Sequence, residues 1–529
     1  MKQFNKRIFT LGSILCLLTI LSYGQGTTQK TTTQKTAAQK TAAQRSTSQI
    51  AAAKKPMNVV FILADDHRYD FMGFMKKVPW LETPNMDRMA RDGAHLKNAF
   101  VTTALCSPSR ASILTGQYAH THTVVDNNAP LPAGLQFFPS YLQKKGYKTG
   151  FFGKWHMGNT DDMPQPGFDQ WVSFKGQGIY YGCTFNVNGK QEKQDKSVYT
   201  TDKLTDYALA WMKSLKKDQP FFTYLSHKGV HAMFEPAARH NGKYADKPIV
   251  SPPSMYLTAT DSSKKYGTIT EPATPVNVAD MPLWVKNQRY SWHGVDYMYH
   301  GEFEFDNFYR RYCETLLAVD ESIGKVTQWL EDNGLAENTL VIYMGDNGFS
   351  FGEHGLIDKR HAYEESMRVP LLAWSPSMIK KGSVINQMIL NLDIAPTILE
   401  LAGVAKPKNM QGISFLSLLK GDTPAKWRDK IFYEYYWEYS FPQTPTIFSI
   451  RTEKYKYIFN QGVWDANELY DLTADPYEMN NLIRNPAVQQ TAASMKKELW
   501  DWLEETGGLQ IPLKKIYNKR NDHRYEGYY

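Results

Sequence analysis

Cysteine is scarce in this sequence of 529 residues, which contains only four of them. Cys16 lies in the first apolar segment, so Cys106, Cys183 and Cys313 are the only cysteines in the rest of the chain. Three thiols are too few for a disulfide-rich scaffold in a chain of this length. A single Cys183–Cys313 disulfide and two buried free thiols both agree with the sequence, whereas Cys106 needs a separate explanation.

Acidic residues are absent from residues 1–56, which carry nine Lys and Arg side chains. The whole chain has 61 basic and 53 acidic residues, so residues 57–529 hold 52 basic and 53 acidic ones, a net charge of −1. The total net charge of +8 therefore comes from the N-terminus and does not indicate nucleic-acid binding. Any attraction for anions must come from a local site.

Long hydrophobic runs are also absent. The longest, Ile8–Leu21, follows a basic start and is too short to span a membrane comfortably, so residues 1–25 are predicted to be a signal peptide. Residues 26–56 nearly repeat the letters TAAQK and lack large apolar residues before Ile50, which predicts a flexible linker. We therefore expect export without stable membrane insertion, with the periplasm preferred over full secretion.

What the sequence does contain is a series of short apolar runs that end in polar residues. Such runs, separated by helical stretches, are typical of buried strands in a parallel sheet, whose ligands bind at the carboxyl ends of the strands. We predict an α/β fold with a large mixed, mostly parallel sheet flanked by helices. The four runs are Asn58–Ala64 before Asp65 and Asp66, Thr149–Gly153 before Lys154 and His156, Phe221–Leu225 before His227 and His231, and Thr339–Met344 before Asp346 and Asn347.

After about residue 425 the sequence pattern changes to aromatic-rich segments in which apolar and polar residues alternate, which predicts a small antiparallel sheet. A helix with Val488, Ala492, Met495, Leu499 and Leu503 on one face follows and should cover it. We assign residues 57–425 to a catalytic domain and 426–529 to a C-terminal subdomain and tail. The expected strands are Ile431–Tyr439, Thr446–Arg451, Lys454–Phe459 and Glu468–Asp471.

Cys106 begins the segment CSPSRASILTG. Pro108 suits the first turn of a helix and Gly116 can end it, so Cys106 should lie at a helix N-terminus, where free amides and the helix dipole favour an anion. A small buried thiol and a thiolate of lowered pKa are two interpretations that require no further chemistry.

The same segment resembles the signature of the type I, formylglycine-dependent sulfatases of the alkaline-phosphatase-like superfamily, Cys-x-Pro-Ser-Arg followed by Leu-Thr-Gly. Other blocks of that family recur in the same order over roughly residues 57–480. The resemblance implies a sulfuric ester hydrolase, similar to secreted bacterial polysaccharide sulfatases, in which Cys106 is oxidised to formylglycine. It also implies a maturation partner, either a formylglycine-generating enzyme or an anaerobic sulfatase-maturating enzyme.

Asp65, Asp66, Asp346 and Asn347 offer hard oxygen ligands, which suit calcium or magnesium better than zinc or copper. The resemblance implies that these residues and modified Cys106 hold one divalent cation, with calcium preferred and magnesium as the alternative.

The resemblance also implies catalytic roles for three cations. Hydrated formylglycine would present two hydroxyl groups, one of which attacks sulfur. Arg110 would hold this nucleophile, and Lys154 and Lys359 would neutralise the sulfate oxygens.

Two histidines complete the implied reaction. His231 would protonate the leaving oxygen, with His227 as a nearby rival, and His156 would take a proton from the second hydroxyl so that sulfate is expelled. His354 and Arg360 flank the segment that carries Lys359 and are expected, with His227, to contact substrate.

The expected substrate is a sulfated carbohydrate, either an algal polysaccharide such as ulvan or a glycosaminoglycan or amino-sugar sulfate. Aromatic clusters at 433–437 and 525–529 could stack on sugar rings or simply pack. A formylglycine phosphonate or phosphodiester hydrolase is the alternative enzyme. An inactive carbohydrate-binding relative would be expected to lack part of the motif, and every expected group is present.

Overall fold

The computed structural model describes residues 55–158, 161–256, 280–289, 291, 293–295, 304–462 and 465–510. The predicted signal peptide, nearly all of the predicted linker and the aromatic tail at 525–529 lie outside these residues, so what was predicted for them stays a prediction. From Lys55 onward the chain forms one compact unit. No helix in the described ranges is both long and apolar enough to cross a membrane.

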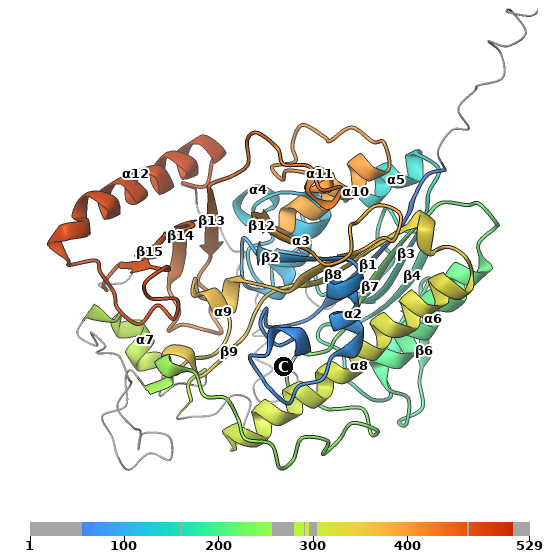
Figure 1. Ribbon diagram of the computed structural model, residues 1–529, viewed down its shortest axis with the longest axis horizontal. Coiled ribbons are helices and arrows are strands. Elements are labelled where there is room, and N and C mark those ends of the chain that lie inside the picture. The colour runs from blue at the N-terminus through green and yellow to red at the C-terminus, as the bar shows by residue number, and fades with distance from the viewer. Residues whose placement is uncertain are drawn as a thin grey trace, which may run out of the picture. The chain divides into compact units, whose positions relative to one another are not determined.

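Ten strands form one central sheet (Figure 1). They are β1 (Asn58–Ala64), β2 (Ala94–Phe100), β3 (Lys148–Lys154), β4 (Gln170–Phe174), β5 (Thr184–Val187), β6 (Lys190–Lys193), β7 (Phe221–Ser226), β8 (Thr339–Gly345), β11 (Leu371–Trp374) and β12 (Ser383–Leu390). Their order is β12-β2-β11-β8-β1-β7-β3-β4-β5-β6. The stretch β8-β1-β7-β3-β4 is parallel throughout, whereas β11, β5 and β6 run antiparallel to their neighbours. The predicted mostly parallel sheet is therefore confirmed.

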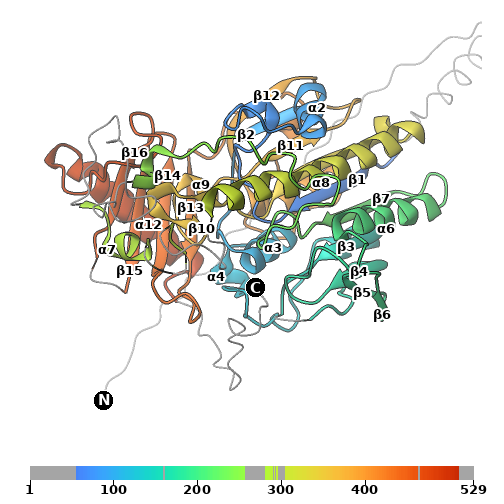
Figure 2. The same ribbon diagram turned by 90° about the horizontal axis from the view of Figure 1, so that it is seen from below.

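Helices cover both faces of this sheet. The α-helices of the described residues are α2 (Pro84–Asp92), α3 (Cys106–Thr115), α4 (Ala119–His122), α5 (Pro139–Lys144), α6 (Thr200–Ser214), α7 (Leu283–Gln288), α8 (Phe305–Asp332), α9 (Glu364–Met367), α10 (Ile394–Leu401), α11 (Leu416–Leu419) and α12 (Gln489–Thr506). Because side chains alternate along a strand, Val59 and Phe61 of β1 join a core with α3 and α10, and Val60 and Ile62 join a second core with α2, α6 and α8. Figure 2 shows α6 and α8 together on one side of the sheet.

The C-terminal region forms the expected antiparallel sheet, β13 (Lys430–Tyr435), β14 (Thr446–Thr452), β15 (Tyr455–Gln461) and β16 (Glu468–Asp471). Helix α12 packs on β14 and β15, as expected. The predicted strand to Tyr439 is too long, because the chain leaves the sheet after Tyr435 and buries Glu438, whose carboxylate accepts a hydrogen bond from Arg360 at 2.9 Å. The boundary between residues 425 and 426 remains a prediction.

Cys183 and Cys313 are both buried and free. Of the two alternatives open from the sequence, the structure contains the pair of free thiols. A short two-stranded ladder, β9 (Ser350–Phe351) and β10 (Ile357–Asp358), lies just before Lys359.

Candidate active site

Polar side chains meet where two neighbouring strands of the central sheet end. Asp65 and Asp66 directly follow β1, and Asp346 and Asn347 directly follow β8. Since β1 and β8 are parallel neighbours, their carboxyl ends lie at one edge. The backbone amide of Asp66 donates to Oδ1 of Asp346 at 3.0 Å. The structure thus brings together the four oxygen-bearing residues predicted from the sequence.

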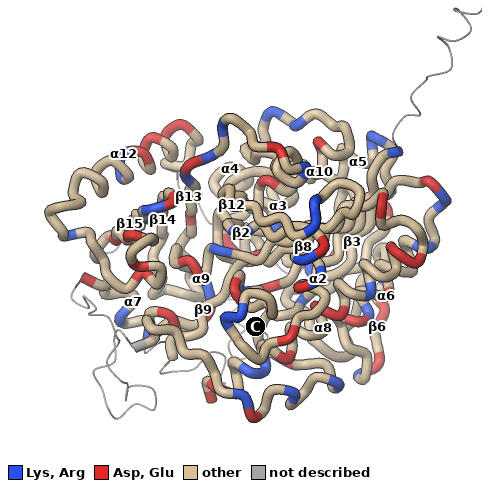
Figure 3. Tube along the Cα trace, viewed as in Figure 1, with Lys and Arg blue, Asp and Glu red and all other residues tan. Residues whose placement is uncertain are grey.

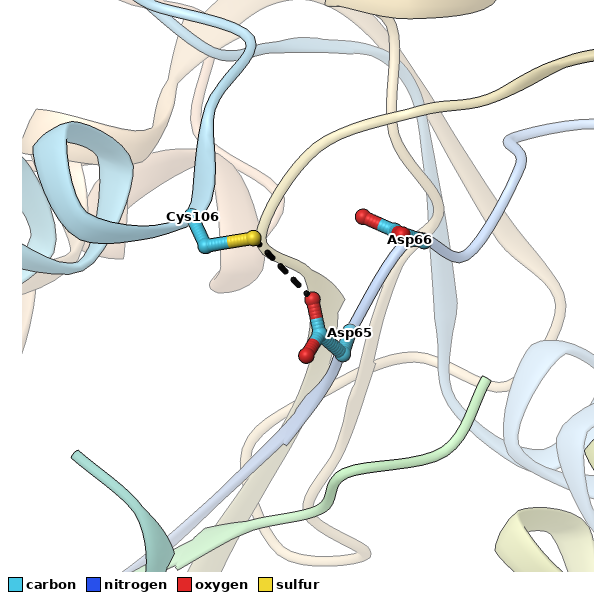
Figure 4. Close-up of side chains that lie close together, drawn as sticks. All are labelled: Asp65, Asp66 and Cys106. Carbon is cyan, nitrogen blue, oxygen red and sulfur yellow. Dashed lines mark hydrogen bonds between the residues drawn. The ribbon is translucent and has the colours of Figure 1, made fainter. Parts of the chain in front are cut away.

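Cys106 approaches this edge from the first position of α3. The preceding Leu105 is extended, and the helix ends where Gly116 adopts a left-handed conformation with φ of 69°, as the sequence predicts. The thiol lies 3.4 Å from Oδ1 of Asp65. Figure 4 shows its side chain directed at the aspartate pair, and the ligand atoms of Asp65, Asp66 and Cys106 lie within 4.8 Å of one another.

The interpretation of Cys106 as a thiolate of lowered pKa is wrong. Burial raises the pKa of the thiol to about 12, and the negative charge of Asp65 adds to this effect. An unmodified cysteine here would be protonated at neutral pH, and thiols are much weaker nucleophiles than thiolates. The helix N-terminus does not outweigh burial beside carboxylates.

Two lysine ammonium groups contact the aspartate pair. Lys154, at the end of β3, donates to Asp65, and Lys359 donates to Asp66 and lies 3.3 Å from Sγ of Cys106. Burial alone would raise the pKa of Asp65, but Lys154 and the surrounding cations hold that pKa well below its usual range. Burial alone would lower the pKa of Lys359, yet Asp66 and its neighbours raise it well above its usual value. Lys359 is therefore a cation beside the sulfur atom.

Arg110 connects three of the strand ends. Its Nε and Nη2 atoms lie 2.9 and 2.7 Å from the same oxygen of Asp346. Its Nη1 atom donates to the carbonyl oxygen of Lys154 at 2.7 Å and to the hydroxyl of Ser226 at 2.6 Å. This side chain is only 1% exposed, so its contacts hold the buried strand ends of the site in place.

Two of the predicted histidines face the same cluster. Nε2 of His231 lies 3.8 Å from Oδ2 of Asp66, while Nδ1 donates to the carbonyl oxygen of Ala232 at 2.5 Å. The carbonyl oxygen of His156 accepts a hydrogen bond from the hydroxyl of Ser107, and its Nδ1 atom is buried without a partner among the described residues. Burial and the charge of Lys154 lower the pKa of both rings well below the usual value, so both rings are neutral at pH 7.

The donor set fits a hard divalent cation. Oδ2 of Asp66 and Oδ1 of Asn347 are buried and accept no hydrogen bond from the described residues. The amide nitrogen of Asn347 donates to Asp66 at 2.7 Å and to the carbonyl oxygen of Gly348 at 2.8 Å, which fixes the orientation of its Oδ1 atom. Buried oxygen atoms without donors are typical of cation ligands, and calcium and magnesium prefer such oxygens.

The three residues predicted to contact substrate lie in different surroundings. The ring of His227 faces α8, where Nε2 lies 3.0 Å from the hydroxyl of Ser322, so the structure does not bring it to the cluster and His231 is the histidine placed there. His354 stacks on Tyr363 with ring centroids 3.9 Å apart. Arg360 donates to Asp358 and Glu438 and lies over the ring of Phe441 at 3.6 Å.

Backbone strain marks several of these positions. Asp66, His156, His354 and Arg360 all have positive φ values, between 53° and 85°, although none is glycine. Such conformations are unfavourable for these residue types and persist where the surrounding structure holds a functional geometry. Five non-glycine residues elsewhere in the described chain also have positive φ, so these conformations agree with a functional site here but do not locate it by themselves.

Some residues of the site were not found from the sequence. Gln177 accepts a hydrogen bond from Lys154, Tyr180 donates from its hydroxyl to the carbonyl oxygen of His231 at 2.6 Å, and Lys228 lies over the Tyr180 ring at 4.7 Å. Lys228 stands in the polar cluster after β7, which was the only signal pointing to it.

Comparisons with known proteins agree with this geometry. The sulfatase family matches residues 57–404, and the family of N-sulphoglucosamine sulphohydrolase C-terminal regions matches residues 352–505. An N-acetylglucosamine-6-O-sulfatase from Bacteroides thetaiotaomicron is 34% identical over 86% of this chain and 86% of its own length. An ulvan-active sulfatase from Formosa agariphila is 27% identical over 87% of this chain and 84% of its own length.

A solved structure of a protein in complex with its substrate D-glucosamine-2-N,6-O-disulfate is also similar. It shares 30% sequence identity and a TM-score of 0.74 with this chain, covering 87% of this chain and all of the other.

Proposed function

Because this chain belongs to the sulfatase family, we propose that it hydrolyses sulfate esters of carbohydrates with formylglycine formed from Cys106. The observation that carries the proposal is the position of Cys106, whose sulfur lies between Oδ1 of Asp65 at 3.4 Å and the Lys359 ammonium at 3.3 Å. Carboxylates and cations surround the one side chain that the family modifies.

Hydrated formylglycine would supply one hydroxyl that attacks sulfur and a second whose ionisation expels sulfate. A divalent cation held by Asp65, Asp66, Asp346, Asn347 and residue 106 would lower the pKa of the attacking hydroxyl, and we prefer calcium over magnesium.

The chain's own cations bind the sulfate group. Lys154 contacts Asp65 and Lys359 contacts Asp66, so both ammonium groups lie at the site. They can neutralise sulfate oxygens there, where bulk water is excluded. Arg110 was expected to hold the nucleophile directly. Its contacts go to Asp346 and to backbone and hydroxyl groups, so we assign it a positioning role.

The two histidines move protons. We assign His231 to the leaving oxygen, since its Nε2 atom is the ring nitrogen left free by Ala232. Burial is the main cause of the lowered pKa of this ring, and the charges of Lys154 and Lys359 add to it. A bound sulfate anion offsets those two charges and so favours protonation of the ring before the alcohol leaves. His156, neutral and with an unpartnered nitrogen, can accept a proton from the second hydroxyl.

The substrate we favour is an amino-sugar 6-sulfate from a glycosaminoglycan, ahead of an algal polysaccharide such as ulvan. The N-acetylglucosamine-6-O-sulfatase is more similar to this chain than the ulvan-active sulfatase. Basic and acidic residues are interspersed along the chain trace in Figure 3, which gives no support for nucleic-acid binding. His354 and Arg360 remain proposed substrate contacts.

Cellular location and maturation are also proposed. The basic start and short apolar run of the N-terminus support export, to the periplasm in preference to full secretion. The enzyme would depend on a formylglycine-generating or anaerobic sulfatase-maturating enzyme, because burial raises the pKa of the Cys106 thiol to about 12 and makes the unmodified thiol a weak nucleophile.

Sulfate release from N-acetylglucosamine 6-sulfate tests the proposal, using protein matured in its own host and supplied with calcium. Wild-type protein should release free sulfate and the Cys106→Ala variant should release none. A phosphonate monoester and an ulvan oligosaccharide serve as parallel substrates. Cleavage of the phosphonate without release of sulfate from either sugar would favour the alternative hydrolase.

A further inference from the structure

Lys228 differs from the other cations of the site in having no carboxylate partner. Asp65 pairs with Lys154, Asp66 with Lys359, and Asp346 with Arg110. Within the described part of the chain, the Lys228 ammonium forms no ion pair or hydrogen bond, and its Nζ atom lies 4.7 Å from the centroid of the Tyr180 ring.

This lysine nevertheless belongs to the site. The loop that carries it lies over the end of β1. There the backbone amide of Asp65 donates to the carbonyl oxygen of Gly229 at 2.9 Å, and the backbone carbonyl oxygen of Asp65 accepts from the amide of Val230 at 2.7 Å. Tyr180 lies against Lys228 with its ring and holds the carbonyl oxygen of His231 with its hydroxyl. Tyr180 thus connects Lys228 to the backbone of His231, the histidine assigned to the leaving oxygen.

The burial of Lys228 matches that of residues that must contact substrate. Its exposed fraction is 3%, compared with 3% for Lys359 and 4% for His231. Long charged side chains are rarely this buried without a partner, because a desolvated charge is unfavourable. Burial, with the nearby charge of Lys154, lowers the pKa of Lys228 to about 8, so the amine is still largely protonated at neutral pH.

The balance of charge indicates what could pair with it. Asp65, Asp66 and Asp346 each already contact another cation of the site, so none of them is left to pair with Lys228. A divalent cation at the proposed metal site would add two further positive charges. A single sulfate ester carries one negative charge, and in the proposed function Lys154 and Lys359 already neutralise it.

We propose that Lys228 is a specificity-determining residue that binds a second anionic group of the substrate, close to the sulfate ester that is cleaved. The group is a sulfate or a carboxylate, on the same sugar ring or on the adjoining one. This role depends on the proposed sulfatase function, and Tyr180 acts as its positioning residue.

The test compares three substrates that share the cleaved 6-sulfate. N-acetylglucosamine 6-sulfate has no second anion, glucosamine 2-N,6-O-disulfate has one on the same ring, and a uronic-acid disaccharide of the 6-sulfate has one on the adjoining ring. For Lys228→Met, which keeps most of the unbranched side chain and loses the charge, kcat/KM should fall roughly 10- to 100-fold on whichever substrate presents the recognised anion. The change should lie mainly in KM and should be under about threefold on N-acetylglucosamine 6-sulfate.

Two further variants control for folding and position. Lys228→Arg keeps the charge and should retain the preference for the second anion. Tyr180→Phe keeps the ring beneath Lys228 but removes the hydrogen bond to His231, so it should lower kcat on all three substrates alike. Equal losses for Lys228→Met on all three substrates would overturn the proposal, because they would mean a structural role or a contact with the cleaved sulfate.

A binding measurement separates this inference from the proposed function. In the Cys106→Ala variant, which should not turn over, the affinity for each sugar can be measured by calorimetry with and without Lys228→Met. Loss of the preference for the doubly anionic sugars supports the role of Lys228 even if sulfate release fails. An unchanged preference overturns it even if the wild-type enzyme is active.

Discussion

Arg110 places two nitrogen atoms on a single oxygen of Asp346, at 2.9 and 2.7 Å, in a site where both side chains are almost fully buried. A guanidinium can do this while its third nitrogen reaches the Lys154 carbonyl oxygen, but a lysine ammonium cannot reproduce that fork. We therefore expect Arg110→Lys to lower kcat/KM by roughly 100-fold, the effect of misplacing a reacting group by about 1 Å.

Steady-state sulfate release checks this prediction. Arg88→Lys is the matched control, since Arg88 is 30% exposed and pairs with Glu331 away from the site. An Arg110→Lys enzyme within threefold of wild type would show that the two-point contact is not needed.

Replacement of His231 should have an effect that depends on the leaving group. His231→Gln removes the proton donor, so hydrolysis of sugar sulfates should slow by roughly 100- to 10,000-fold, the usual contribution of a general acid. Nitrophenyl sulfate, whose leaving group needs no proton, should be hydrolysed nearly as fast as by wild type. His240→Gln, which affects a histidine paired with Glu321, serves as the control. Equal losses on both substrates would rule out the assigned role.

His227 should affect stability and not catalysis. Burial lowers the pKa of its ring to about 3, below the usual value of 6.5. The folded state therefore favours the neutral ring, so its contribution to stability is present above pH 6.5 and is lost as the pH falls from 6.5 towards 3. His227→Gln should lower the free energy of unfolding at pH 7.5 and lower it less at pH 5, with kcat/KM changed by less than about threefold. Urea unfolding at the two pH values measures the difference, and a large rise in KM would instead restore His227 as a substrate contact.

Metal removal should reveal the role of the unpartnered oxygens of Asp66 and Asn347. Chelation should abolish sulfate release, and calcium should restore it better than magnesium. Because an ion that binds only the folded state stabilises it by mass action, calcium should raise the Tm of chelated wild-type protein. Asn347→Ala should need far more calcium for the same rise, whereas Asn333→Ala, after α8, should behave as wild type. A Tm insensitive to calcium and magnesium would contradict the proposed site.

Much of the fold and site follows from local sequence pattern. Asp65 and Asp346 could be placed together because each follows a buried run, and parallel strands end at one edge. The bounds of α3 followed from Pro108 and Gly116, which act within their own turns. These features depend on residues close together in the chain.

Other features depend on partners distant in sequence and could not be read locally. The strand after Lys430 ends early because Glu438 pairs with Arg360, 78 residues away. His227 and His231 follow the same strand, and the sequence does not tell which ring faces the site. The contact of the His227 ring with the hydroxyl of Ser322 on α8 shows that it is His227 that faces away. The raised pKa of Cys106 likewise comes from burial by the whole fold rather than from its helix position.

The central claim is that residue 106 acts as formylglycine, and mass spectrometry of the peptide containing it tests this most directly. Protein from its own host should give a peptide roughly 18 Da lighter than the cysteine form, or the hydrate of that species, as expected for the nucleophile of covalent catalysis. The account would be contradicted if folded, exported protein released sulfate while all of its residue 106 was unmodified cysteine. The thiol would then have to support turnover without the second hydroxyl.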